Sequence, residues 1–314
     1  MTGAKGFIGS SLVPYFLDRG IGTLRVLERS LAPGQASDEN VDVLLGDLLS
    51  PNDCSAFVTG LDVVYYLAHR NTPVNSDADF SSDSMLNSIP LLNLIQAIRN
   101  AGKKTHVVYF SSGGAVYGNS SDRIPFKETD PCVPVSSYGI QKLLAEQYLR
   151  LAAQQGILTA TVLRVGNAYG KLLPSQRMQG LIGVVLSKLL HREQVVIFGN
   201  PNNVRDYIHV DDICSVCEKV IDPFEEFSVF NVANQAGYSV LEVIAIIEEV
   251  LGQPFERVLA HEDTRGQRLP DWCVLDTARA RRALSWAPQV SLHEGIMKAV
   301  SATESIASPT KASR

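Results

Sequence analysis

Two kinds of segment alternate along the first two-thirds of the chain. Short runs rich in β-branched residues at 24–27, 63–67, 106–110 and 159–163 are predicted to be strands. Between them lie longer segments with apolar residues at helical spacing. Those at 84–101 and 136–155 end just before Gly102 and Gly156, which suit helix C-caps. This βαβ alternation predicts an α/β fold, a Rossmann-type doubly wound parallel sheet.

After Gly170 the alternation loosens into a stretch containing Pro, Gly and Gln, followed by a helix-compatible run at 181–190. We expect residues 1–168 to form a dinucleotide-binding domain, with 204–234 returning to it. Residues 169–203 and 235–300 are expected to form a smaller C-terminal substrate domain. The last segment, 301–314, is rich in Ser, Ala and Thr and is predicted to be a disordered tail.

Composition excludes several classes of partner. The chain has 28 basic and 33 acidic residues, a net charge of −5, and no run of Lys or Arg that would bind nucleic acid or an anionic membrane. No apolar run approaches the roughly 18 residues of a membrane helix, and no secretory signal opens the chain, which favours the cytoplasm.

The cysteines do not indicate a metal site or a disulfide framework. There are five, an odd number scattered through a long chain. Cys214 and Cys217 form a CxxC pair, but a second ligand pair at zinc-like spacing is missing. They lie in an apolar, helix-compatible stretch at 213–220, so we expect them to face the core.

A glycine-rich loop opens the chain. Gly3, Gly6 and Gly9 precede a helix-compatible run at 10–18, and such glycines let the backbone turn tightly and approach a pyrophosphate at the positive end of a helix. Glu28 closes the next predicted strand, where a carboxylate can bind ribose hydroxyls. A plain turn and a solvated charge are the alternative interpretations, and Arg29 leaves a preference for NADP open.

Tyr138 and Lys142 are four residues apart, which places both side chains on one face of a helix. A phenol titrates near 10, so its use as a base near pH 7 requires a shift worth about 4 kcal/mol. A neighbouring ammonium supplies part of that shift. An isolated pair of this kind is usually a solvated surface pair, but this one follows a predicted strand ending in Ser111 and Ser112. The combination predicts a catalytic pair.

Five segments, GAKGFIG, FSSGGAVYG, YGIQK, LRVGNAYG and VRDYIHVDDI, occur in this order. Together they resemble the extended short-chain dehydrogenase/reductases, specifically the sugar-nucleotide epimerase/dehydratase group, over residues 3 to about 295. The resemblance implies NAD as cofactor, a nucleotide sugar as substrate and a homodimer. Transferred residue by residue, it implies that the NAD site is lined by Gly3, Gly6, Phe7, Ile8, Gly9, Glu28, Asp47, Leu48, Ala68 and Asn87.

The resemblance also implies roles at the reacting end of the site. Tyr138 would be the catalytic acid/base, and Lys142 would hold the nicotinamide ribose and lower the pKa of the tyrosine. Asn167, Arg205 and Arg265 match positions that contact the nucleoside diphosphate. A guanidinium can donate two parallel hydrogen bonds to phosphate oxygens. For each arginine, a surface or interdomain salt bridge is the alternative role. The segment around His209 predicts a helix start with Asp211 or Asp212 as N-cap and purely structural roles.

Three departures from the family pattern stand out. The chain begins at Met1-Thr2-Gly3, without the strand that normally precedes the loop, and each backbone group left unpaired at the centre of a sheet costs about 1 to 3 kcal/mol. We therefore expect a misplaced start or a truncated reading frame. The Ser/Thr position of the family falls on Gly113, so the hydroxyl comes from Ser112, from Ser111 or from neither, and we choose Ser112. His69 replaces a small residue beside the cofactor.

The reaction follows partly by elimination. Dehydratases of the group carry an Asp-Glu pair where this chain has Gly114 and Ala115, and decarboxylases carry a glutamate at the second position. The resemblance thus favours an NAD-dependent UDP-hexose 4-epimerase working by transient hydride transfer. Two alternatives stay open. One is a nucleotide-sugar reductase or dehydrogenase, and the other is a catalytically impaired NAD or nucleotide-sugar binding protein, which the missing strand and Gly113 would suit.

Overall fold

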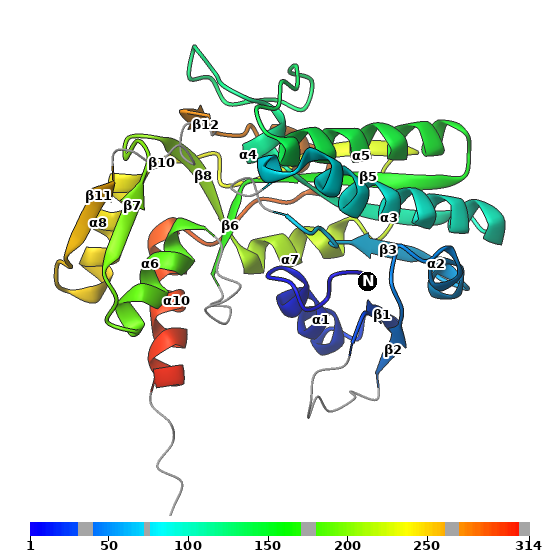
Figure 1. The fold of residues 1–314 in the computed structure, drawn as a ribbon, viewed down its shortest axis with the longest axis horizontal. Helices are drawn as coiled ribbons and strands as arrows, with labels where there is room; N and C mark the ends of the chain where they lie inside the picture. The colour runs from blue at the N-terminus through cyan, green and yellow to red at the C-terminus, as the bar shows by residue number, and fades with distance from the viewer. Residues whose placement is uncertain (31–39, 72–75, 171–179, 261–269, 308–314) are drawn as a thin grey trace, which may run out of the picture.

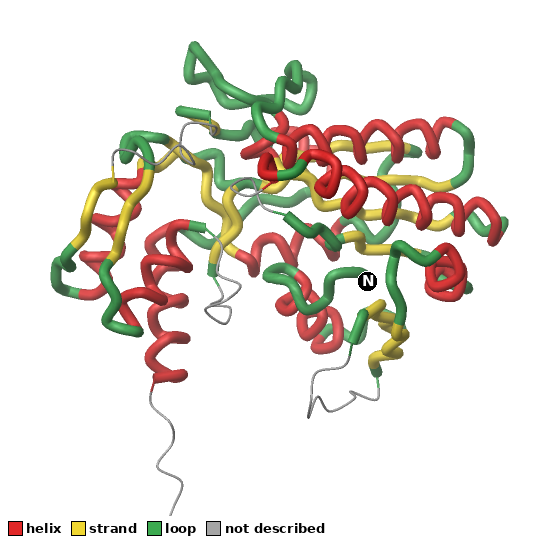
Figure 2. The backbone as a smooth tube through the Cα atoms, in the orientation of Figure 1, coloured by secondary structure: helices red, strands yellow, loops and turns green. Residues whose placement is uncertain are grey.

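The computed structural model describes residues 1–30, 40–71, 76–170, 180–260 and 270–307 (Figures 1 and 2). Its main sheet is entirely parallel. Its strands form two groups. In the first, β1 (Leu24–Glu28) pairs with β2 (Val41–Leu45). In the second, neighbouring strands pair in the order β3 (Val63–Tyr66), β4 (Thr105–Ser112), β5 (Leu158–Val165) and β9 (Phe227–Val232). Thr2 bridges to Leu27 and to Tyr66, which joins the two groups of strands into one sheet. The predicted doubly wound fold is confirmed.

Helices cover both faces of this sheet because its strands alternate their side chains. Val107 and Tyr109 of β4 pack under α2 (Pro51–Val58), α3 (Phe80–Ala101) and α5 (Ser137–Gln154). Val108 and Phe110 point to the opposite face, where α1 (Gly9–Asp18) and α7 (Val210–Lys219) lie (Figure 1). A parallel sheet buried on both faces directs its functional groups to the carboxyl ends of its strands.

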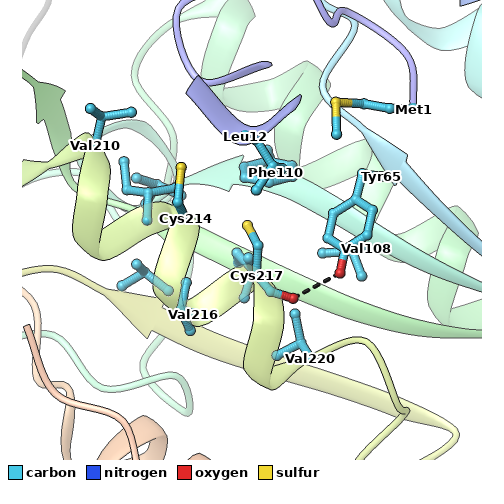
Figure 3. Close-up of a cluster of buried hydrophobic side chains, with 14 of the residues drawn as sticks. Met1, Leu12, Tyr65, Val108, Phe110, Val210, Cys214, Val216, Cys217 and Val220 are labelled. Carbon is cyan, nitrogen blue, oxygen red and sulfur yellow. Dashed lines mark hydrogen bonds between the residues drawn. The ribbon is translucent and has the colours of Figure 1, made fainter. Parts of the chain in front are cut away.

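Among the described residues, Met1 and Thr2 lie between β1 and β3 at the centre of the sheet. The N–H of Thr2 donates to the carbonyl of Tyr65 at 3.0 Å, and the N–H of Leu27 donates to the carbonyl of Met1 at 3.0 Å. Figure 3 shows Met1 in the core beside Leu12 and Tyr65. The N–H and C=O of a strand residue point to the same side. The N–H groups of Arg25 and Tyr65 therefore point into the space between β1 and β3, next to Met1, where no strand of the described residues lies. Burial, with a smaller effect of Arg25, lowers the pKa of the Met1 amine to about 5.

The CxxC pair lies in the same core. Cys214 and Cys217 on α7 are buried free thiols, and the hydroxyl of Tyr65 donates to the carbonyl of Cys217 at 2.7 Å (Figure 3). Burial raises the pKa of both thiols, which makes thiolate chemistry unfavourable. The prediction that these cysteines face the core is confirmed.

A second group of elements lies beside the main sheet, at the left of Figure 1. β8 (Val204–His209) pairs with β6 (Asn167–Tyr169), β10 (Gly237–Ser239) and β12 (Trp272–Cys273), and β7 (Val195–Phe198) pairs with β11 (Arg257–Ala260). The helices α6 (Leu181–Leu190), α8 (Val240–Leu251) and α10 (Leu292–Ala307) share an apolar core built around Ile182, Ile244 and Ile296. Two shorter helices are α4 (Gly113–Val116) and α9 (Ala278–Leu284), and a 3₁₀ turn covers Ser76–Ala78.

Several element boundaries differ from the predictions. The helix α3 begins at Phe80, earlier than the predicted start, because the Asp79 side chain caps it by accepting from the N–H of Ser82 at 3.0 Å. The predicted N-cap at Asp211 or Asp212 is wrong. His209 is the N-cap, its ring nitrogen accepting from the N–H of Asp211, and both aspartates lie in the first turn of α7.

The predicted tail is also wrong in its first half. The helix α10 continues through residue 307, and the remaining residues, 308–314, lie outside the described structure. Once a helix is nucleated, each further residue costs little, and alanine and glutamate propagate it well. Each helix in the described ranges lacks the length or the apolar character needed to cross a membrane.

Candidate active site

Tyr138 and Lys142 lie in the first two turns of α5. The Ser136 side chain caps this helix by accepting from the N–H of Gly139 at 3.2 Å. The Lys142 Nζ is 5.5 Å from the centre of the Tyr138 ring and donates to the carbonyl of Phe110 at 2.8 Å. The β4 strand thus fixes the ammonium, and the helix geometry sets the tyrosine beside it, as the four-residue spacing predicts.

Burial controls the ionisation of both groups. It raises the pKa of Tyr138 to about 12, and hydrogen bonding with Ser112 acts in the opposite direction. Burial also lowers the pKa of Lys142 to about 7, while the negative charge of Glu146 acts to raise it. The described arrangement therefore favours a neutral phenol beside an amine that titrates near neutral pH, and it does not display the lowered tyrosine pKa that the resemblance implies.

The structure separates the two candidate serines. The Ser111 hydroxyl is buried and donates to Glu146 Oε1 at 2.5 Å, so its hydrogen bond is made within the core. The Ser112 hydroxyl interacts with Tyr138 instead. A Cβ on Gly113 would lie 2.3 Å from Leu275 Cδ1, which explains why a side chain at this position does not fit. Ser112 is thus the hydroxyl beside the tyrosine.

The glycine loop packs tightly on the end of β3. A Cβ on Gly3, whose φ is +69°, would lie 2.9 Å from the N atom of Ala68, and a Cβ on Gly9 would lie 2.3 Å from the carbonyl O of Gly3. The loop leads into α1 through Phe7 and Ile8, both partly buried against the core. Side chains at Gly3 and Gly9 would collide with the backbone of the loop and of the β3 end, so glycine is needed for this tight turn. A tight glycine turn that leads into a helix suits the pyrophosphate of a dinucleotide.

Carboxylates follow the first two strands at the same sheet edge. Glu28 ends β1, and its carboxylate pairs with Lys5 Nζ at 3.4 Å, so it is an ion-paired group rather than a freely solvated charge. After β2, Asp47 accepts from the N–H of Leu49 at 2.9 Å, and Leu48 is buried in the core. These groups lie where the resemblance places the adenosine end of NAD.

A buried network joins the segment after β3 to α5. Asn87 on α3 accepts from the N–H of Arg70 at 2.9 Å and donates to Asp83. Asp83 is fully buried and also accepts from the Ser137 hydroxyl at 2.5 Å, next to Tyr138. Asn87 is expected from the sequence, whereas Asp83 and Ser137 are not, because a buried acid within a helix carries no local pattern.

The substrate side of the site contains Asn167 and Arg205. A Cβ on Gly114 would lie 3.2 Å from Asn167 Oδ1, so Asn167 borders the turn that carries Ser112. Arg205 on β8 is buried, and it donates to the carbonyl of Val204 at 2.8 Å. Among the described residues no carboxylate forms an ion pair with it, and burial lowers its pKa. An unpaired buried guanidinium fits an anionic ligand. Arg265 lies in 261–269, outside the described residues.

The comparisons with known proteins agree with this geometry. The family model described as "NAD dependent epimerase/dehydratase family" matches residues 1–233. The chain belongs to this family. A UDP-glucose 4-epimerase from Mycolicibacterium smegmatis is 32% identical over 96% of both chains. The crystal structure of a UDP-glucose 4-epimerase from Thermotoga maritima with UDP-glucose matches with a TM-score of 0.87, 28% identity, and coverage of 97% of this chain and 98% of that one.

A second solved structure is the UDP-glucose 4-epimerase from Thermus thermophilus in complex with NAD. It matches with a TM-score of 0.85, 28% identity, and coverage of 96% of this chain and 97% of that one. The family assignment and the NAD cofactor inferred from the five motifs are therefore confirmed.

This member of the epimerase/dehydratase family supports its active site with a buried ion pair. Arg164 on β5 and Glu146 on α5 lie 2.7 Å apart and are both almost completely buried. Arg164 also donates to the Tyr117 hydroxyl at 2.9 Å, which in turn donates to Asn231 at 2.7 Å. Because Glu146 binds the Ser111 hydroxyl, the pair holds the β4 end and α5 in a fixed relation. No local pattern in the sequence predicts this pair.

Proposed function

We propose that this chain is an NAD-dependent nucleotide-sugar epimerase and that its reaction is the 4-epimerisation of a UDP-hexose. The observation that carries the proposal is that Tyr138, Lys142 and Ser112 lie together in a chain that also has a tight glycine loop and a buried Arg205, with which no carboxylate of the described residues forms an ion pair. The UDP-glucose 4-epimerases from M. smegmatis and T. maritima support the choice of substrate.

Each group has a chemical task in this proposal. The glycine loop would hold NAD⁺, which would supply reversible hydride acceptance at the sugar carbon. Tyr138 takes the proton from the sugar hydroxyl and later returns it, with Ser112 orienting the phenolic oxygen. Lys142 donates to the nicotinamide ribose and favours the phenolate when it is charged. Arg205 and Asn167 hold the nucleoside diphosphate while the sugar turns, and we assign Arg265 to the same task.

A second candidate is a nucleotide-sugar reductase. The observation that favours it is a dTDP-4-dehydro-6-deoxyglucose reductase from Escherichia coli, 28% identical over 76% of this chain and 74% of that protein. A reductase consumes its cofactor in each turnover, whereas an epimerase regenerates it. Stoichiometric change in NADH absorbance with sugar conversion would therefore indicate the reductase.

The Tyr138→Phe variant tests the proposed acid/base. We expect interconversion of UDP-glucose and UDP-galactose to fall by about 10²-fold or more, while the NAD content per chain stays close to that of the wild type. Tyr148→Phe is the matched control, because Tyr148 lies on the same helix and is 38% exposed. Unchanged turnover in Tyr138→Phe would remove the tyrosine from the mechanism.

We also propose a cytoplasmic homodimer with the two domains predicted from sequence, 1–168 with 204–234 and 169–203 with 235–300. The dimer proposal rests on exposed apolar side chains of α3 and α5, among them Met85, Ile89, Tyr148 and Leu151. The cytoplasmic proposal rests on five cysteines that are all free thiols. Light scattering of Leu151→Glu tests the dimer: the variant should have half the mass of the wild type.

A further inference from the structure

His69 follows the end of β3 and lies against the tyrosine. Its ring centre is 4.8 Å from that of Tyr138, with the two planes 87° apart. The Nε2 atom is buried, and among the described residues no group forms a hydrogen bond with it. Burial and the nearby charge of Lys142 hold the pKa of His69 well below its usual value, so the ring is neutral at neutral pH.

The position of His69 is fixed on both sides. The preceding residue, Ala68, is in the tight contact with Gly3 that seats the glycine loop on β3. The following residue, Arg70, donates its N–H to Asn87 at 2.9 Å. Through Asp83, the same network reaches α5 beside Tyr138. His69 therefore stands between the glycine loop and the Tyr138–Lys142 pair.

A dinucleotide that joins the glycine loop to Tyr138 and Lys142 must pass this imidazole. A buried polar atom without a partner costs about 1 to 3 kcal/mol, so a ligand that supplies a partner for the His69 Nε2 atom gains that free energy on binding. NAD presents many oxygen acceptors along its ribose and phosphate groups, and a neutral imidazole has one N–H to donate.

We propose that His69 is a cofactor-binding residue whose Nε2–H donates a hydrogen bond to an oxygen of bound NAD. The inference rests on NAD being the cofactor in the proposed function. It gives the imidazole a task that the small residue of the family pattern cannot perform. The imidazole also packs against the Tyr138 ring in a T-shaped arrangement, so cofactor binding and the orientation of the phenol are coupled at one side chain.

The test compares His69→Phe, which keeps a planar ring against Tyr138 but has no donor, with His69→Gln, which keeps one. NAD is titrated calorimetrically into NAD-free protein without any sugar. We expect the dissociation constant of His69→Phe to rise about tenfold, which is about 1.4 kcal/mol, and that of His69→Gln to rise less. The midpoint of unfolding of NAD-free His69→Phe should not fall, because the lost atom has no partner there.

His106→Asn is the control, since His106 is also a buried histidine of the sheet but lies at the opposite end of β4. Asparagine can keep the bond that the His106 Nδ1 shares with Thr159. The NAD affinity of His106→Asn should equal that of the wild type. Wild-type affinity in His69→Phe, or a lower unfolding midpoint of the NAD-free variant, would overturn the proposal. If His69→Phe loses affinity but the wild type converts no UDP-sugar, the proposed function fails and the cofactor contact stands.

Discussion

The buried Lys142 should make this protein less stable than a variant that lacks the amine. Lowering the pKa of Lys142 from 10.5 to about 7 by burial corresponds to about 5 kcal/mol at pH values below 7. In Lys142→Met the bond to the carbonyl of Phe110 is lost, which costs about 1 kcal/mol. A methionine of similar length fills the same space. The NAD-free variant should therefore have a free energy of unfolding about 3 to 4 kcal/mol higher at pH 6.

The sign of the pH dependence follows from the direction of this shift. Between the folded pKa of about 7 and the unfolded value of 10.5, the unfolded chain binds the extra proton, so wild-type stability rises with pH. At pH 9 the remaining cost of the lysine is about 2 kcal/mol, and the advantage of Lys142→Met shrinks to about 1 kcal/mol. Taking the difference between the two proteins cancels titrating groups that do not interact with Lys142, such as Asp206.

Urea unfolding of both proteins at pH 6 and pH 9 provides the measurement, and the midpoints are compared at equal denaturant slope. The same variant should lose turnover, since the ammonium is the proposed partner of Tyr138. A variant that is no more stable than the wild type at pH 6, or a stability gap that does not change with pH, would refute the reasoning.

Two further predictions follow from single contacts. Gly113→Ser should lower the free energy of unfolding by about 1 to 3 kcal/mol through the clash with Leu275, and should cost less in a Leu275→Ala background, measured by urea unfolding. Arg205→Met should leave unliganded stability unchanged or higher while weakening UDP binding about tenfold or more in calorimetry; wild-type affinity would exclude the arginine from the nucleotide site.

The sheet and the catalytic helix could be predicted because their signals are local. The β-branched runs form strands whose ends lie within two residues of the predicted ends. Gly102 caps α3 with a φ of +67°, as predicted. The spacing of Tyr138 and Lys142 is sufficient to place them together, since it depends only on helix geometry. The motifs in their order identified the family before any contact was known.

The groups that hold the site in place have no such local signal. Asp83 meets Ser137 across two helices, and Glu146 meets Arg164 across a helix and a strand. These partners are far apart in sequence and become neighbours only after the sheet forms. The His209 cap was missed for a related reason, because histidine is not among the residues that commonly cap helices. The contact of His69 with Tyr138 likewise requires β3 and α5 to be packed together.

The most direct test of the central claim follows the carbon-bound hydrogen of the sugar. The purified protein is incubated with UDP-glucose carrying deuterium at C4, and the product is analysed by mass spectrometry and NMR. Our account predicts UDP-galactose that keeps the deuterium at C4, with no net NADH formed and with turnover in Tyr138→Phe lowered by about 10²-fold or more. Absence of UDP-galactose, replacement of the deuterium by solvent hydrogen, or NADH accumulating in step with sugar conversion would contradict the account.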